Sequence, residues 1–460
     1  MDSHHLLKFS RLPGSAPRGL HAPGVVALAS SLLLCLLSGA HLRAATAGPQ
    51  AQEPSEHVAA QQETPPDSQR AEGPPASEPS SWRARLRTLQ AKGLHLYETF
   101  NYRGLYPRLD WIAEKSGPAL GVRYWQPDLF GPIDAAGAAF YSWRRYQLYD
   151  FRIGLIPHRG QDLPPDPLQN ERIDQVGDVD GEGFSKVKLY ASARFRDRAD
   201  DSFYGSGPSS NRSDLLRYRI KDALGEVTTG YQWSQHLGLT LKGGYLEHSL
   251  ACGRSAPRLC ENMPAAVLPG IENPPHYFRL RAISLLDFRD SVGIPHRGLM
   301  WAVTWTRWDN VNSGDRFNFH EIATDLRGYV PLARESHILA LRTVLIDNDP
   351  GPSNLVPFFL QPTLGGVDTL RGYDSFRFRG DKLMLIQAEY RWEVTDRFGL
   401  ALFGDTGTVA ERGTRLSLDS LKSDWGLGFR LLGSDRVVLG IDEAFSNEGM
   451  HTQIRLGASF

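Results

Sequence analysis

Alternation of apolar and polar side chains with a period of two runs from about residue 105 to the end of the chain. In residues 186–196, apolar side chains occupy one face of an extended strand, and mostly basic or hydroxyl-bearing ones occupy the other. The same arrangement recurs in residues 237–245, 382–394 and 451–460. Long charged side chains on one face of many successive strands need water, and the opposite apolar face needs lipid. The pattern therefore predicts an all-β transmembrane antiparallel β-barrel rather than a soluble β-sandwich, whose polar face seldom carries Arg and Glu on nearly every strand.

Sixteen segments follow this alternation, and residues 105–113 are an extra or alternative first strand. The segments are 118–125, 135–143, 147–156, 186–196, 215–222, 226–233, 237–246, 278–288, 299–306, 316–327, 337–347, 381–394, 398–409, 424–432, 436–444 and 451–460. Barrels of single bacterial chains have even strand numbers, short periplasmic turns and long extracellular loops. The long connections that follow odd-numbered segments are 157–185, 247–277, 348–380 and 410–423. Residues 197–214, after the fourth segment, break this rule, so we expect about sixteen strands with one exception to it.

The overall composition agrees with a barrel and excludes two other classes of protein. Hydrophobic residues make up 41% of the chain and the mean hydropathy is −0.35, which no helical membrane protein would average. A barrel fits these values because only every second strand residue faces lipid. The formal net charge of −1 leaves no basic excess to neutralise phosphates, so nucleic acid is not an expected partner.

The N-terminal part has the features of an export signal and a linker. Basic residues precede an apolar run too short for a transmembrane helix, and Ala45-Thr46-Ala47 offers a cleavage site, so residues 1–47 are the expected signal peptide. Residues 48–81 are rich in Pro, Gln, Glu and Ser, which predicts a disordered periplasmic linker. Residues 82–104 form either a short amphipathic segment or a plain connector. The barrel then occupies residues 105–460.

A Gly-rich stretch with basic residues follows the eleventh expected segment, and the next two segments aim carboxylates inward. If this stretch is an extracellular loop folded into the lumen, Arg371 meets Glu389 and Asp405 and forms charge-assisted bonds to the wall. Gly372 would let the backbone turn tightly, and Tyr373 would wedge against the wall. The expected structural lock of the inward loop is thus Arg371, Gly372, Tyr373, Glu389 and Asp405. The alternative is that Arg371 simply lines an extracellular loop.

Three motifs in this region resemble the signature of the BamA/TamA bacterial surface antigen superfamily. They are LRGY at 370–373, AEYR at 388–391 and FGDTG at 403–407. A further stretch, LDFRDSVGIPHRG at 286–298, is similar to the D-x-R-D…P-x-x-G strand-to-turn element of that family. The final strand ends in Phe460, which resembles the aromatic C-terminal signal by which assembly machinery recognises such barrels.

The resemblance covers residues 105–460 and implies several properties that the residues alone leave open. It implies that Arg371 at the loop tip pairs with Glu389 and Asp405. It also implies sixteen strands, of which the first and the last meet at a weak seam. Family members carry periplasmic POTRA domains of mixed α/β pattern before the barrel, but no such domain fits within residues 48–104. The chain therefore resembles a member that lacks POTRA domains.

Two cysteines remain after removal of the signal peptide. Cys252 and Cys260 lie close together in a loop that an oxidising compartment would surround, so a local disulfide is expected, with two free thiols as the alternative. Two sulfurs without a nearby pair of histidines do not make a zinc site. Because no hydrolase or metalloprotease motif is present either, we expect no catalytic residues, no metal and no cofactor.

The resulting functional expectation is a barrel that assists insertion or translocation of proteins at the outer membrane. Its expected partners are outer-membrane lipid, the barrel assembly machinery during biogenesis, and unfolded outer-membrane client proteins. The alternative is a passive pore or a structural surface antigen without insertase activity. An outer-membrane enzyme, with a site assembled across strands, is a third and less favoured hypothesis.

Overall fold

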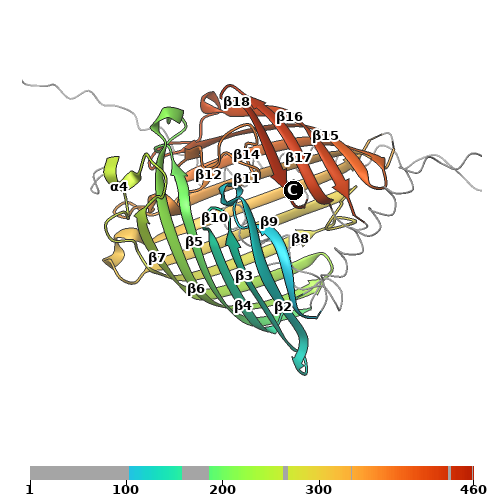
Figure 1. Cartoon of the computed structure of the whole chain (residues 1–460), viewed down its shortest axis with the longest axis horizontal. Coiled ribbons are helices and arrows are strands. Elements are labelled where there is room, and N and C mark those ends of the chain that lie inside the picture. The colour runs from blue at the N-terminus through green and yellow to red at the C-terminus, as the bar shows by residue number, and fades with distance from the viewer. Residues whose placement is uncertain (1–102, 158–185, 263–267, 333, 434–436, 458) are drawn as a thin grey trace, which may run out of the picture. The chain divides into compact units, whose positions relative to one another are not determined.

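The computed structural model describes residues 103–157, 186–262, 268–332, 334–433, 437–457 and 459–460. Within them one sixteen-stranded sheet pairs its strands in chain order, each antiparallel to the next. The strands are β1 (Gly104–Trp111), β2 (Pro118–Phe130), β3 (Ile133–Ser142), β4 (Gln147–Leu155), β5 (Val187–Phe203), β6 (Leu216–Ser234), β7 (Leu237–Cys252), β8 (Tyr277–Asp287), β9 (Gly298–Asn310), β10 (Phe319–Pro331), β11 (His337–Asp349), β14 (Lys382–Thr395), β15 (Phe398–Ala410), β16 (Lys422–Leu432), β17 (Val437–Ser446) and β18 (Gly449–Arg455). The sheet curves round so that its last strands, in red, return toward the first ones, in blue (Figure 1). The predicted all-β fold with about sixteen strands is confirmed.

Two of the expected segments, 215–222 and 226–233, form the single strand β6. The residues between them continue the ladder, because Gly225 pairs with Ala193 on β5 and with Tyr245 on β7. Both neighbours therefore satisfy the backbone where a break was expected. The total remains sixteen because residues 105–113, the alternative first strand, supply β1.

Counting from β1 changes the end of the barrel at which some connections lie. The connection that contains residues 157–185 follows β4, so the prediction that it follows an odd-numbered strand is wrong. The connection between β5 and β6 now follows an odd-numbered strand, which removes the exception expected at residues 197–214. The long connections after β7, β11 and β15 keep their places. These three connections therefore mark the extracellular end.

The two faces of the sheet differ as the alternation predicts. Along β14, the side chains of Ile386 and Trp392 are exposed, whereas those of Gln387 and Glu389 are buried. The apolar face is therefore the outer one, and charged residues line the bore. Many of these buried charges pair across strands, because an unpaired charge in a low-dielectric interior is costly. No helix in the described part of the chain is long and apolar enough to cross a membrane.

The connection between β11 and β14 folds inside the barrel and forms a small second sheet. Its strands β12 (Thr363–Leu364) and β13 (Phe378–Arg379) pair with each other. Leu370 and Tyr373 lie between them in sequence and belong to the same buried apolar cluster as inward-facing residues of β11 and β14. We call this connection, residues 350–381, the inward loop.

The large sheet has two free ends within the residues that the structure describes, because no strand pairing joins β1 to β18. β18 ends at Arg455, so the prediction that the strand continues to residue 460 is wrong. Gly457 then takes a positive φ of 101°, which an extended strand does not allow. Phe460 packs in a buried cluster with Tyr329 and Ile338 on the inner wall. Its role as an assembly signal stays a prediction.

The expected N-terminal regions lie outside the described residues. This holds for the signal peptide, residues 1–47, and for the linker, residues 48–81. Only Arg103 and Gly104 of the segment 82–104 are described, and Gly104 already begins β1. The domain boundaries therefore stay predictions.

Candidate functional site

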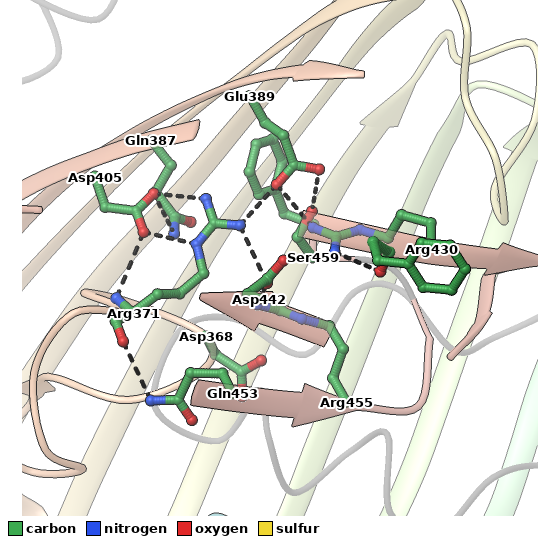
Figure 2. A network of polar contacts seen from close by, with 12 residues as sticks. Asp368, Arg371, Gln387, Glu389, Asp405, Arg430, Asp442, Gln453, Arg455 and Ser459 are labelled. Atoms are coloured by element: carbon green, nitrogen blue, oxygen red, sulfur yellow. Dashed lines mark hydrogen bonds and ion pairs between the residues drawn. The ribbon is translucent and has the colours of Figure 1, made fainter. Parts of the chain in front are cut away.

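The guanidinium of Arg371 is the centre of a buried polar network inside the barrel (Figure 2). Its Nε and Nη2 donate to the two carboxylate oxygens of Asp405, at 2.7 and 2.9 Å. Its Nη1 donates to Oε2 of Glu389 at 2.7 Å. All three side chains are buried, with none exposed by more than 2%. The inward loop thus brings Arg371 to carboxylates on both β14 and β15, in the bidentate geometry that a planar guanidinium favours.

An aromatic ring completes the surroundings of Arg371. Its Cζ lies 3.4 Å from the ring centroid of Phe403, two residues before Asp405 on the same face of β15. Burial by itself lowers the pKa of Arg371, but Asp405 and Glu389 outweigh burial and hold that pKa well above its usual value. Arg371 therefore stays charged, and removal of either carboxylate would leave the buried cation with less counter-charge.

Gly372 and Tyr373 occupy the positions next to this ion pair. A Cβ added to Gly372 would lie 2.6 Å from Cβ of Asp424. The carbonyl oxygen of Gly372 accepts from Oγ of Ser446 at 2.6 Å. The φ of Gly372 is outside the left-handed range, so close approach to the wall requires this glycine rather than the tight turn we expected. The hydroxyl of Tyr373 donates to Oδ1 of Asn447 at 2.7 Å, and burial raises its pKa to about 12.

Further polar residues surround the predicted ones, and the sequence pattern did not identify them as part of the site. Asp442 on β17 accepts from Arg371, Arg430 and Arg455. Gln387 donates from Nε2 to Oδ1 of Asp405 at 3.2 Å. The alternation indicates that these side chains point inward, but it does not indicate which strands meet the inward loop. Their selection therefore needs the fold.

Two further arginines fix the inward loop to other parts of the barrel. Arg377 donates to Glu448, in the turn between β17 and β18, at 2.9 Å, and to Oγ of Ser210 at 2.8 Å. Arg379 is buried and donates to the carbonyl of Phe358 and to the hydroxyl of Tyr218 on β6. The loop is thus bonded to the walls on both sides of the bore and crosses it.

Of the other predicted site residues, Phe460 reaches this network through Arg391, which donates both to the carbonyl of Phe460 and to Glu389. Cys252 at the end of β7 and Cys260 in α4 (Leu259–Asn262) form a disulfide, with their Cα atoms 5.4 Å apart. In the D-x-R-D element, Arg289 donates to both oxygens of Asp287, at 2.9 and 2.8 Å. Among the described residues, no group of three or more His, Cys, Asp or Glu side chains is arranged to hold a metal.

A lipid-facing sheet of sixteen strands, a charged bore and an inward loop with a buried arginine together define an outer-membrane β-barrel. The chain belongs to the Omp85 superfamily, whose domain model matches residues 183–437. The resemblance to the BamA/TamA superfamily is therefore confirmed, and the protein is located in the outer membrane.

The individual relatives are distant. The outer membrane protein assembly factor BamA of Nitratidesulfovibrio vulgaris is 29% identical over 161 residues, which span 31% of this chain and 20% of that protein. The structure of BamA from Haemophilus ducreyi lacking POTRA domains 1–3 has a TM-score of 0.51 and 13% identity, and the match covers 81% of this chain and 78% of that one. CdiB from Acinetobacter baumannii matches with a TM-score of 0.42 and 12% identity, over 74% of this chain and 57% of that one. The match to the Haemophilus ducreyi structure concerns the fold alone.

Proposed function

We propose that this protein assists the insertion or translocation of other proteins at the outer membrane. The observation that carries the proposal is the seam, defined as the two facing strands β1 and β18, which are not paired with each other in the described residues. Backbone groups left unpaired in a lipid environment are costly, so such an edge favours pairing with another strand. An unfolded barrel client supplies strands of the required kind. This work needs no covalent catalysis, and we propose that the protein is not an enzyme.

The inward loop argues against a passive pore. Arg371 and Arg379 hold it to opposite sides of the bore, and both side chains are buried. A charged bore crossed by a bonded loop does not offer a stable open path to solutes. The remaining space includes a cavity of about 300 Å3 beside the seam, which Trp111 of β1 and Ile454 of β18 both line.

The proposed partners follow from the same surfaces. The outer face exposes apolar side chains along most of the strands and contacts outer-membrane lipid. The barrel assembly machinery would insert this chain during its own biogenesis. Clients would be unfolded outer-membrane proteins, as the name of the assembly factor from Nitratidesulfovibrio vulgaris suggests for that relative.

Reconstitution into liposomes tests the proposal. An unfolded barrel client should insert faster into liposomes that contain this protein than into empty ones. Arg371→Ala should reduce this acceleration, while Arg307→Ala, an exposed arginine paired with Asp309, should retain it. Planar-bilayer recording should give small and erratic currents. Equal insertion rates with and without the protein, together with a stable open conductance, would instead identify a pore.

A further inference from the structure

The hairpin formed by β17 and β18 is bonded to the inward loop from the middle of its strands to its turn. We propose that Asp442 is a positioning residue that couples the seam strand β18 to the loop, so that the hairpin stays with the loop when the seam opens. This inference rests on the function proposed above, because it states which strand of the seam the inward loop holds. It predicts that movement at the seam occurs between β18 and β1, and not between β18 and the loop.

Asp442 is the carboxylate that connects the strand to the lock. Its side chain is fully buried and its Oδ2 accepts from Nη2 of Arg455, on β18, at 2.7 Å. The same oxygen lies 3.5 Å from Nη1 of Arg371, and Oδ1 accepts from Nη1 of Arg430 at 2.5 Å. Figure 2 shows these three guanidinium groups around one carboxylate. Without its negative charge they would repel one another in a buried site.

Contacts toward the extracellular end extend this coupling. On β18, Nε2 of Gln453 donates to the backbone carbonyl of Arg371 at 3.2 Å. On β17, the hydroxyl of Ser446 donates to the carbonyl of Gly372. In the turn between the two strands, Glu448 accepts from Arg377 of the loop at 2.9 Å. The loop is therefore bonded to the hairpin at three places: the middle of the hairpin's strands, the end of β17 near the turn, and the turn itself.

On the other side of the seam, the partner of β1 in the sheet is β2. β1 continues the sheet through β2 on one side only, with a regular ladder from Gly104 to Trp111. In the described residues, no strand pairing reaches from this ladder to β18. The bonds described above hold the β18 edge to the loop, whereas β1 is held in the sheet through its ladder with β2.

Distances between spin labels on the full-length protein test the coupling without any client. One label pair, at Met450 on the outer face of β18 and Asp374 on the loop, reports the hairpin–loop distance. A second pair, at Met450 and Leu109 on the outer face of β1, reports the seam. Labelling without reductant leaves the disulfide intact. The wild-type hairpin–loop distribution should be narrow, and the seam distribution should be broader.

Asp442→Asn should broaden the hairpin–loop distribution by about a factor of two, since coupling through a packed network is lost with its shared carboxylate. Glu226→Gln is the matched control, because Glu226 is also buried and bonded at 2.7 Å to an arginine, Arg279, on another part of the wall. It should leave the distribution narrow. Where Asp442→Asn does not fold, Arg455→Gln provides the same measurement.

A hairpin–loop distribution that stays narrow in Asp442→Asn or Arg455→Gln would overturn the proposal. A wild-type seam distribution narrower than the hairpin–loop one would overturn it as well. Both measurements are independent of client insertion, so failure of the coupling and failure of the proposed function are distinguishable. Adding an unfolded client to the wild-type protein should widen only the seam distribution.

Discussion

The buried arginine of the inward loop is stable because its donors have partners. Two bonds reach Asp405, one reaches Glu389, and the ring of Phe403 covers the guanidinium face. Such a group is costly to bury alone and favourable only as part of the complete set. The lock is therefore sensitive to loss of any single member.

Arg371→Ala should lower the free energy of unfolding by about 3–5 kcal/mol, because it leaves the carboxylate of Asp405 buried without its cation, while Glu389 keeps Arg391 and Arg430. The variant should lose heat-resistant folded migration on gels at a lower temperature than the parent. Arg371→Lys keeps the charge but not the bidentate geometry, so the temperature at which it loses folded migration should lie between those of the parent and Arg371→Ala. A variant as resistant to heat and protease as the parent would contradict this role of Arg371.

Gly372→Ala should also loosen the loop, for a steric reason. The added methyl group would lie 2.6 Å from Cβ of Asp424, so wall or loop has to shift. Overpacking of this kind costs about 1–3 kcal/mol, which urea unfolding of the barrel can measure. Gly413→Ala is a suitable comparison, since no atom lies within 4 Å of that position, although its positive φ adds some strain of its own. Equal stability of the Gly372 and Gly413 variants would refute the close-approach argument.

Part of the site could be predicted from the sequence at this scale. Arg371 was found because an arginine stands in a Gly-rich connection, and Glu389 and Asp405 because each is an inward carboxylate on the next two strands. Asp442 and Arg430 also point inward, but so do many other charged residues of the barrel. Only the curvature of the sheet brings these two to the loop, and alternation along one strand contains no information on curvature.

Among the elements, a strand was predictable wherever its hydrogen-bonded ladder covers the same residues as the alternation of apolar and polar side chains. β14 and β15 match their expected segments closely because each alternates from end to end. β6 was divided in two, because a pattern along one strand does not show that neighbours on both sides continue through Gly225. The last segment was made too long, because the side chains after Arg455 alternate although the backbone does not remain in the sheet.

The inward loop is bonded to the barrel through Arg371, Arg377 and Arg379, which predicts how the bore responds to mutation. Arg371→Ala releases the loop from β14 and β15, and Arg379→Ala releases it from Tyr218 on β6. The double variant should show larger and longer-lived single-channel conductance than either single variant, because each single variant keeps the other of these two anchors. Equal conductance of the double variant and the parent would show that the loop does not block the bore.

The disulfide constrains an extracellular element and not the lock. Cys252→Ser with Cys260→Ser should make the connection between β7 and β8 more sensitive to protease, because the chain from the end of β7 to α4 loses its covalent closure. Heat-resistant migration of the barrel should be nearly unchanged, since neither cysteine belongs to the network around Arg371. Limited proteolysis followed by gel migration measures both. Loss of the folded barrel form in this variant would show that the disulfide supports the whole sheet.

For the whole molecule, the barrel class follows from a physical requirement that the sequence displays directly. Apolar side chains on one face and charges on the other suit lipid outside and water inside, and this held over the described strands. The seam was implied by family resemblance and not by residue pattern, because a strand that lacks a partner has the same alternation as one that has two.

Chemical closure of the seam shows whether clients insert through the gap between β1 and β18. In the Cys252→Ser, Cys260→Ser background, cysteines at Trp111 and Thr452, which line the same cavity beside the seam, can be joined by a reducible bifunctional linker. Client insertion should fall to the rate of empty liposomes when β1 and β18 are joined, and it should recover when the linker is reduced. Insertion at the full rate with the seam joined would show that clients do not enter between β1 and β18.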